Sequence, residues 1–289
     1  MTTAVPIASE QESQTVLGAD EILEQMWALT QGAEPRQVQG PVRIGVDLGT
    51  SHVMVAVLDE DGRPVAGATE PARVVKDGLV TDYFGAVRIV RRLVADLEAQ
   101  LSRPLRHAAC AIPPGTGAGA ERITANVLES AGLEVTRVVD EPTAAGALLG
   151  IRDGAVVDVG GGTTGISVLR DGEVAYTADE PTGGTHFTLV LAGHLNLSFE
   201  EAERFKLSPE HSREVTVAVR PVMEKVAAIV ASHLRRCPAK HIYLVGGTAS
   251  VPGIGEVLER VIGVPVTIPA RPLLVTPMGI ALLSTPQEG

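Results

Sequence analysis

Aromatic residues and cysteines are scarce in this chain of 289 residues. Phe, Trp and Tyr together make up 3% of the sequence although 45% of it is hydrophobic, so we expect a core built from Val, Leu, Ile and Ala. The two cysteines, Cys110 and Cys237, lack CxxC spacing, which argues against a disulfide framework and against a zinc site. We expect both to be reduced thiols in buried or helix-end positions.

Long apolar runs and clusters of basic residues are missing as well. No uninterrupted apolar run approaches the length of a membrane span, and no basic-then-apolar signal opens the chain. The net charge is −11, from 24 Lys and Arg against 35 Asp and Glu, so the surface repels phosphate backbones and anionic lipid. These features predict a cytoplasmic protein that binds neither nucleic acid nor a membrane.

The first forty residues differ in composition from the remainder. Residues 1–40 are rich in Gln, Glu, Thr and Ala, which is typical of a mobile tail. Within them the stretch DEILEQMWALTQG predicts a short helix that is capped by Asp20 and stopped by Gly32. Two interpretations of this helix are open: it packs on the main body, or it docks a partner.

From residue 41 onward, strand and helix patterns alternate and then repeat. The stretch RIGVDLGTSHVMVAVLDEDGRPV, from Arg43 to Val65, is echoed by VVDVGGGTTGISVLRDGEV, from Val156 to Val174. Asp47 matches Asp158 at an offset of 111 residues, and each stretch ends in an Asp-Gly turn. A strand–helix–strand unit with a short Pro-led helix follows each copy. Long-period similarity of this kind predicts two related halves that face each other.

The repeated turn has a chemical rationale. A strand end places a carboxylate at a fixed point, and the glycine-rich turn after it exposes backbone N–H groups. Carboxylates suit hydrated Mg²⁺, and converging N–H groups suit phosphate oxygens. One Asp-x-Gly turn is weak evidence because ordinary strands also end this way. Two copies in register predict a shared metal and phosphate site.

Four motifs in a fixed order resemble those of a known superfamily. DLGTS, DEPTAAGALLG, DVGGGTTGISVL and LVGGTASVPGI are similar to the first phosphate loop, connecting helix, second phosphate loop and adenosine loop of the actin and DnaK-type chaperone ATPases. KDGLVTDYFGAV and AERFK are more like the rod-shape actins of bacteria. As a whole, the chain from Val42 to Leu283 resembles the ethanolamine-utilisation protein J family, whose members look like a chaperone ATPase half without a substrate-binding domain.

The resemblance implies an actin-like ATPase fold, in which two RNase H-like α/β domains surround a nucleotide cleft. Domain I would comprise residues 41–142 plus 266–289, and domain II residues 143–265. The implied ligands are ATP or ADP with Mg²⁺. Asp47 and Asp158 would hold the metal through water, and Glu141 would orient the attacking water.

The resemblance also assigns the remaining contacts of the nucleotide. The phosphates would lie between Gly49, Thr50 and Ser51 on one side and Gly160, Gly161, Gly162 and Thr163 on the other. Gly183 and Gly184 would approach the terminal phosphate, Glu203 and Lys206 the ribose and base, and Gly246 and Gly247 the adenine.

Two of these roles have a purely structural alternative. Two further positions differ from the chaperone sequences. Glu203 and Lys206 also fit a solvated i,i+3 pair, and Glu141 also fits a cap of the helix that Pro142 begins. Gly165 stands where the chaperones carry a second Asp, and Ser250 where they carry an Arg near the adenine. These departures predict weak nucleotide binding and slow hydrolysis.

Three functions remain open on this reasoning. The first is an ATP-binding, chaperone-like protein of ethanolamine utilisation. It would be a slow Mg²⁺-dependent ATPase, associated with the enzyme microcompartment, whose partner is ethanolamine ammonia-lyase or another microcompartment protein. The second is a filament-forming actin homologue. The third is a scaffold with a degenerate site that acts without nucleotide.

Overall fold

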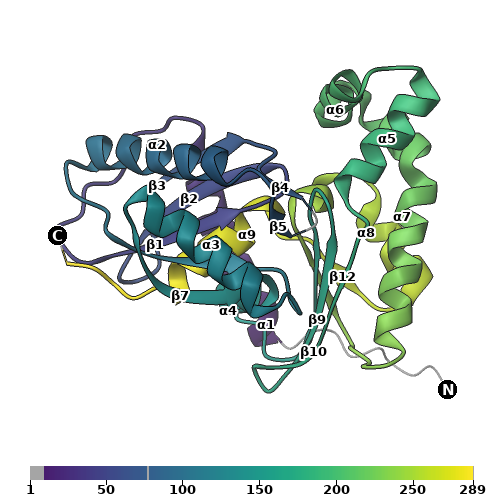
Figure 1. Cartoon of the computed structure of the whole chain (residues 1–289). Coiled ribbons are helices and arrows are strands. Elements are labelled where there is room, and N and C mark those ends of the chain that lie inside the picture. Colours follow the sequence, from purple (N-terminus) through teal and green to yellow (C-terminus); the bar gives the residue numbers. More distant parts are fainter. Residues whose placement is uncertain (1–9, 77, 289) are drawn as a thin grey trace.

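Two five-stranded sheets of the same topology form two halves of the molecule (Figure 1). The computed structural model describes residues 10–76 and 78–288. The first sheet has the order β3-β2-β1-β6-β7 and the second the order β10-β9-β8-β11-β12. In both, a three-stranded antiparallel meander continues into parallel strands. The repeat predicted from the sequence therefore corresponds to a structural duplication.

The strands of the two sheets come from successive parts of the chain. The first sheet contains β1 (Val42–Leu48), β2 (His52–Asp59), β3 (Pro64–Pro71), β6 (His107–Ile112) and β7 (Glu134–Asp140), with the short β4 (Val75–Lys76) and β5 (Leu79–Val80) pairing beside it. The second contains β8 (Gly154–Val159), β9 (Thr164–Arg170), β10 (Glu173–Glu180), β11 (Ile242–Val245) and β12 (Val266–Thr267).

Helices cover each sheet and complete two lobes. In the first lobe α2 (Tyr83–Leu101) and α3 (Ala118–Ala131) pack on the sheet, and in the second α5 (Gly184–Leu195), α7 (Ser212–Leu234) and α8 (Ile254–Ile262) do so, with α6 (Phe199–Leu207) on α5. The amphipathic period of α2 buries one face, and Asp82 caps its start by accepting a hydrogen bond from the Gly85 N–H. The core is aliphatic, as the composition predicts.

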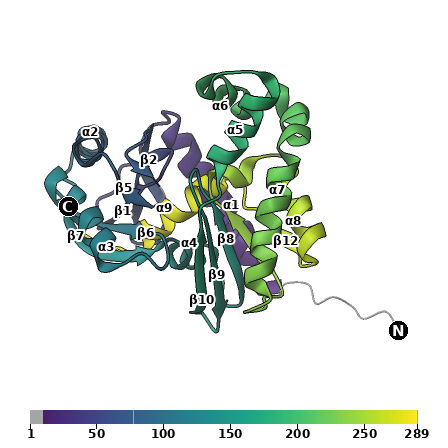
Figure 2. The same cartoon turned by 45° about the vertical axis from the view of Figure 1, so that its right-hand side comes forward.

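Two small-residue helices lie between the sheets (Figure 2). These are α4 (Glu141–Leu149) and α9 (Pro272–Leu283), and they cross in direct contact. A Cβ on Gly279 would lie 1.9 Å from the Ala144 carbonyl oxygen, and one on Gly45 of β1 would lie 2.4 Å from the Ala281 nitrogen. Glycine at these two positions therefore allows α9 to pack this closely on α4 and on β1.

The N-terminal segment differs from the expected mobile tail. A helix, α1 (Glu10–Thr30), precedes the first lobe, and it is longer than the predicted one. Leu23 and Met26 are fully buried in the core between the lobes. Arg271 pairs with Glu24 and stacks over the Trp27 ring. The expectation of a mobile tail is wrong for residues 18–40, because this helix packs on the body and the linker after it is hydrogen-bonded to the first lobe.

The expected boundary between the domains at residue 266 also needs correction. It falls at the start of β12, which pairs with β11 inside the second sheet. The chain returns towards the first lobe with α9, which contacts β1 and β2 as well as β11. Within the described part of the chain, none of the helices has the length and apolar character needed to cross a bilayer.

Candidate nucleotide-binding site

Three acids from three elements converge between the lobes. Asp47 lies at the end of β1, Asp158 near the end of β8, and Glu141 at the first turn of α4. Burial, and then the charge of Asp158, raises the pKa of Asp47 from 3.8 to about 7. Burial raises the pKa of Glu141 well above its ordinary value, with Asp158 and Asp47 adding to the effect. The three residues that the sequence analysis singled out for metal and water therefore lie within electrostatic range of one another.

Asp158 is held in place from two sides. Its Oδ2 accepts a hydrogen bond of 2.9 Å from Thr276 Oγ1 of α9. A Cβ on Gly246 would lie only 2.2 Å from its Oδ1, and Gly246 has a φ of +89°. Burial raises the pKa of Asp158 to about 6, which the bond from Thr276 partly opposes. In this structure Gly246 makes room for the Asp158 carboxylate, a role that the sequence analysis did not assign to it.

Glu141 does not cap its helix. The cap of α4 is Asp140, whose Oδ1 accepts from the Thr143 N–H at 2.9 Å and whose Oδ2 accepts from Thr143 Oγ1 at 2.6 Å. The structural alternative for Glu141 is therefore wrong. Because the neighbouring acid performs the capping, the Glu141 side chain is left to approach Asp47 and Asp158.

The two glycine-rich loops meet across the lobes. The first, Gly49, Thr50 and Ser51, links β1 to β2, and the second, Gly160 to Thr163, links β8 to β9. A Cβ on Gly161 would lie 2.1 Å from Ser51 Oγ and 3.5 Å from the Thr50 Cβ. The two loops are 111 residues apart in the sequence and belong to separate sheets, and the packing of α4 on α9 between those sheets brings them together.

The start of α5 packs directly on the second loop. Gly184 N–H donates to the Gly160 carbonyl at 2.9 Å, and Thr185 N–H donates to the Gly161 carbonyl at 2.8 Å. A Cβ on Gly183 would lie 2.7 Å from the Gly160 oxygen, so a larger residue would push this helix away. The N-terminal end of a helix attracts anions, and here that end adjoins the loop expected to hold phosphate.

Glu203 and Lys206 bond to each other and to α5. Lys206 Nζ donates to Glu203 Oε2 at 2.8 Å, to Thr188 Oγ1 at 2.9 Å and to the Gly184 carbonyl at 3.3 Å. Its side chain is only 8% exposed, so the alternative of a solvated surface pair is wrong for Lys206. The pair joins α6 to the start of α5, beside the loops, and contact with a ribose or base stays a prediction.

The carboxylates and the backbone N–H groups that meet here suit a hydrated divalent cation and a phosphate chain. Among the described residues, none donates a hydrogen bond to the carboxylates of Asp47 or Glu141, and both side chains are half-buried. Carboxylate oxygens are the ligands that Mg²⁺ prefers, usually with several waters retained. No three His, Cys, Asp or Glu side chains in the described ranges are placed to ligate an ion directly, and water-mediated contact is the arrangement that suits this geometry.

Two further side chains lie beside these loops and were not among the predicted site residues. Asp179, in β10, raises the pKa of Asp158 and of Glu141 through its charge. His52 directly follows the first loop, and burial lowers its pKa, while the charge of Glu203 acts in the opposite direction. The position of His52 next to Ser51 was a usable signal. For Asp179 there was none, because only the sheet register brings it to the site.

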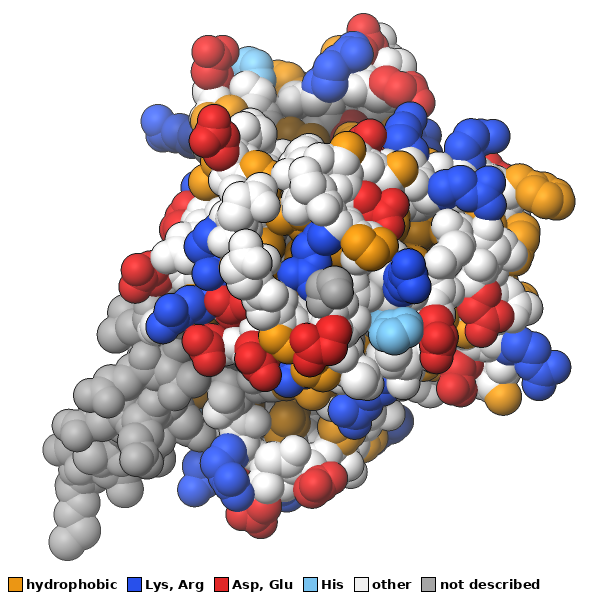
Figure 3. Space-filling model, turned by 90° about the vertical axis from the view of Figure 1, so that its left-hand side faces the viewer, with side chains coloured by type: hydrophobic (Ala, Val, Ile, Leu, Met, Phe, Trp, Pro, Cys, Tyr) orange, Lys and Arg blue, Asp and Glu red, His pale blue; other side chains and the backbone are white. Residues whose placement is uncertain are grey.

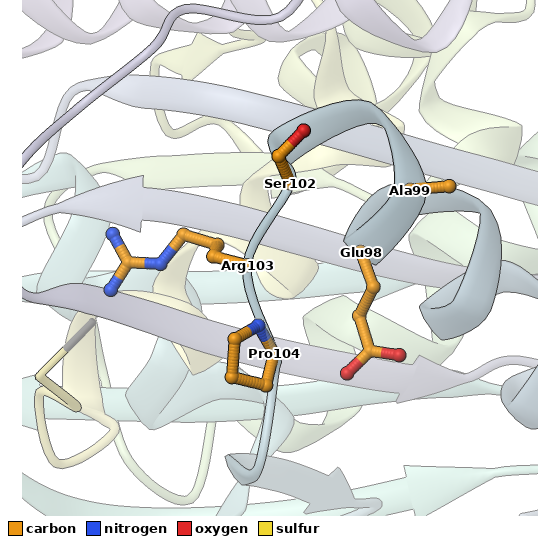
Figure 4. Close-up of a pocket in the computed structure, with 5 residues that line it drawn as sticks. All are labelled: Glu98, Ala99, Ser102, Arg103 and Pro104. Carbon is orange, nitrogen blue, oxygen red and sulfur yellow. The ribbon is translucent and has the colours of Figure 1, made fainter.

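Two features of the described surface contrast with the site. A shallow pocket at the end of α2 is lined by Glu98, Ala99, Ser102, Arg103 and Pro104, and there the Arg103 side chain points away from Glu98 (Figure 4). On the face drawn in Figure 3, basic and acidic side chains are interspersed. Neither feature gathers the acids and N–H groups that meet between the lobes.

Comparisons with known proteins agree with this architecture. Residues 64–202 match the family model of the MreB/Mbl protein and residues 155–280 that of the cell division protein FtsA. The crystal structure of MreB5 of Spiroplasma citri bound to ADP superposes with a TM-score of 0.67 at 17% identity, over 86% of this chain and 95% of that one. The protein therefore has the actin-like ATPase fold, as predicted.

Closer relatives define the family. Ethanolamine utilization protein EutJ of Escherichia coli (strain K12) is 48% identical over 248 residues, which cover 86% of this chain and 87% of that protein. The crystal structure of ethanolamine utilization protein EutJ from Carboxydothermus hydrogenoformans has a TM-score of 0.89 at 47% identity, over 93% of this chain and 99% of that chain. The chain belongs to the ethanolamine utilization protein EutJ family.

Proposed function

We propose that this protein binds ATP and ADP with Mg²⁺ between its lobes and changes shape with the state of the nucleotide. The observation that carries the proposal is the contact between the Gly49–Ser51 and Gly160–Thr163 loops beside three acids, Asp47, Glu141 and Asp158, whose pKa values are all raised. MreB5 of Spiroplasma citri, which shares the fold, has been solved bound to ADP and bound to AMPPNP. This supports a nucleotide at the corresponding place here.

The chain's own residues suggest how the site would work. Bound Mg²⁺ would neutralise phosphate charge, with Asp47 and Asp158 holding its water shell. The N–H groups of both loops would bind phosphate oxygens, and the positive end of the α5 dipole beside the second loop would favour the negative charge. Glu141 would orient the attacking water if hydrolysis takes place, since phosphoryl transfer depends chiefly on positioning and charge neutralisation.

Calorimetric titration tests nucleotide binding directly. ATP and ADP are titrated with Mg²⁺ into the wild type, into Asp158→Ala, and into Glu173→Gln as an exposed acid of the same lobe. We expect binding in the wild type and the Glu173 variant and its loss in the Asp158 variant. Absence of binding heat and of any thermal shift in the wild type at saturating Mg²⁺ and nucleotide would refute the proposal.

In the cell we propose a chaperone-like role in ethanolamine utilisation, supported by membership of the EutJ family. The proposed partner is ethanolamine ammonia-lyase or another microcompartment protein. The wild type should retain such a protein on an affinity matrix in a manner that depends on nucleotide, and Asp158→Ala should not. Equal retention by both, in either nucleotide state, would favour a scaffold that acts without nucleotide.

Filament formation is the second candidate, favoured by the match of residues 64–202 to the MreB/Mbl model. Sedimentation with and without Mg²⁺ and ATP distinguishes it from the first. A pellet that appears only with nucleotide would support a polymer. Material that stays in the supernatant at high protein concentration would rule this candidate out.

A further inference from the structure

The second lobe carries an acid that has no counterpart in the first. Strand pairing aligns Asp158 of β8 with Gly165 of β9, and Gly165 with Asp179 of β10. Residues paired directly across neighbouring strands point to the same face of a sheet. The three positions therefore form one row, with a carboxylate at each end and no side chain in the middle.

The corresponding row of the first lobe is different. There Asp47 of β1 pairs with Met54 of β2, and Met54 pairs with Thr69 of β3. Met54 is buried and fills the middle position, and the Thr69 hydroxyl donates to the Val53 carbonyl. The row in the first lobe thus has one acid, at one end, whereas the row in the second lobe has an acid at each end.

Neither crowding nor backbone strain explains the glycine at position 165. A Cβ there would meet its nearest neighbours at 3.8 to 3.9 Å, which is ordinary van der Waals distance, and its φ is not in the left-handed region. Two of these neighbours are Asp158 Cβ and Asp179 Oδ1, each at 3.9 Å. A larger side chain would occupy the space through which the two acids face each other.

Asp179 also acts electrostatically on the site. Its charge contributes to the raised pKa of Asp158 and of Glu141, two acids on different elements. Its Oδ1 is buried. Neighbouring carboxylates repel one another, and a cation shared among them relieves that repulsion.

We propose that Asp179 is a further metal-positioning acid, which holds the water shell of Mg²⁺ together with Asp158 across the side-chain-free position 165. This inference rests on the proposed nucleotide function and deepens it. Because Gly165 lies between the two acids, moving the acid from position 179 to position 165 should preserve much of the same interaction.

The test separates metal binding from nucleotide binding. The dissociation constant for ADP is measured by calorimetry with Mg²⁺ and with EDTA, and their ratio gives the enhancement due to the metal. We compare the wild type, Asp179→Ser, the double variant Asp179→Ser with Gly165→Asp, and Glu173→Gln as a control at the exposed start of β10.

We expect Asp179→Ser to reduce the metal enhancement by about tenfold or more, since groups that orient the ligands of a metal have effects of this size. Its affinity for ADP in EDTA should be unchanged or higher, because a negative charge near the phosphates is gone. The double variant should recover most of the enhancement, and Glu173→Gln should match the wild type.

Three results would overturn the inference. The first is a metal enhancement in Asp179→Ser equal to that of the wild type. The second is an equal fall in both affinities together with a lower unfolding midpoint, which would show a merely structural role. The third is a double variant no better than the single one. If the wild type itself binds neither ATP nor ADP, the proposed function fails, and this inference fails with it.

Discussion

Replacing Asp47 by Asn should stabilise the protein in the absence of metal. Burial and the charge of Asp158 raise the pKa of Asp47 from 3.8 to about 7. The folded state therefore binds this proton more tightly than the unfolded state. Below pH 3.8, the pKa of Asp47 in the unfolded chain, the residue does not lower the stability of the protein. The stability falls as the pH rises from there towards 7 and is lowest above pH 7.

The size of the effect follows from the pKa difference. At about 1.4 kcal/mol for each pKa unit, the rise of Asp47 corresponds to at most about 4 kcal/mol of lost unfolding free energy at pH 8. Asn keeps the shape of the side chain and removes the charge. The variant should therefore gain up to this amount at pH 8, and should gain little at pH 4.5.

Urea unfolding measures this directly, with the single tryptophan, Trp27, as the fluorescence probe. Curves are recorded at pH 4.5 and pH 8, with and without Mg²⁺ and ADP. Asp96→Asn, an exposed acid on α2, serves as the control. Under the proposed function, the ligands should restore the wild type more than the variant. An Asn variant that is less stable than the wild type at pH 8, or a gain that does not change with pH, would refute the reasoning.

Three further substitutions test the packing around the site, each by urea unfolding. Gly183→Ala should cost about 1–3 kcal/mol, because its Cβ would press on the Gly160 oxygen, whereas Gly193→Ala, with open space around it, should be neutral or slightly stabilising. Leu23→Ala should lower the free energy of unfolding by about 2–5 kcal/mol, since Leu23 is fully buried between the lobes. An unchanged free energy of unfolding would mean that α1 does not pack on the two lobes. Asp140→Ala should cost about 1 kcal/mol as the cap of α4 is lost, and an unchanged midpoint would contradict that role.

Most of the secondary structure was predictable because its signals are local. The apolar period of α2, the Ser198–Glu201 capping box of α6 and the glycine at position 132 that ends α3 can each be recognised from a few neighbouring residues. The repeat predicted two matching sheets, and the sheet order confirms it. The error at the N-terminus arose because a polar composition says little about a helix with a narrow buried stripe.

Site chemistry was predictable only in part. Asp47, Asp158 and Glu141 were found because each stands in a recognisable motif next to a strand end. The same patterns did not distinguish Asp140 from Glu141 as the cap of α4, since adjacent acids are equivalent until the residue with extended backbone angles before the helix is known. Nor did they show why position 246 is glycine, because the carboxylate that needs the space belongs to a distant strand.

Sequence patterns were sufficient for the elements, the duplication and the two phosphate-type loops, since all of these depend on residues close together in the chain. Tertiary structure alone decided that α1 joins the interlobe core, that Lys206 is buried against α5, and that Asp179 faces Asp158. The reason is that strand register and helix packing bring together residues whose separation in the chain carries no pattern. Contacts of that kind are set by the burial of whole surfaces and not by any local preference.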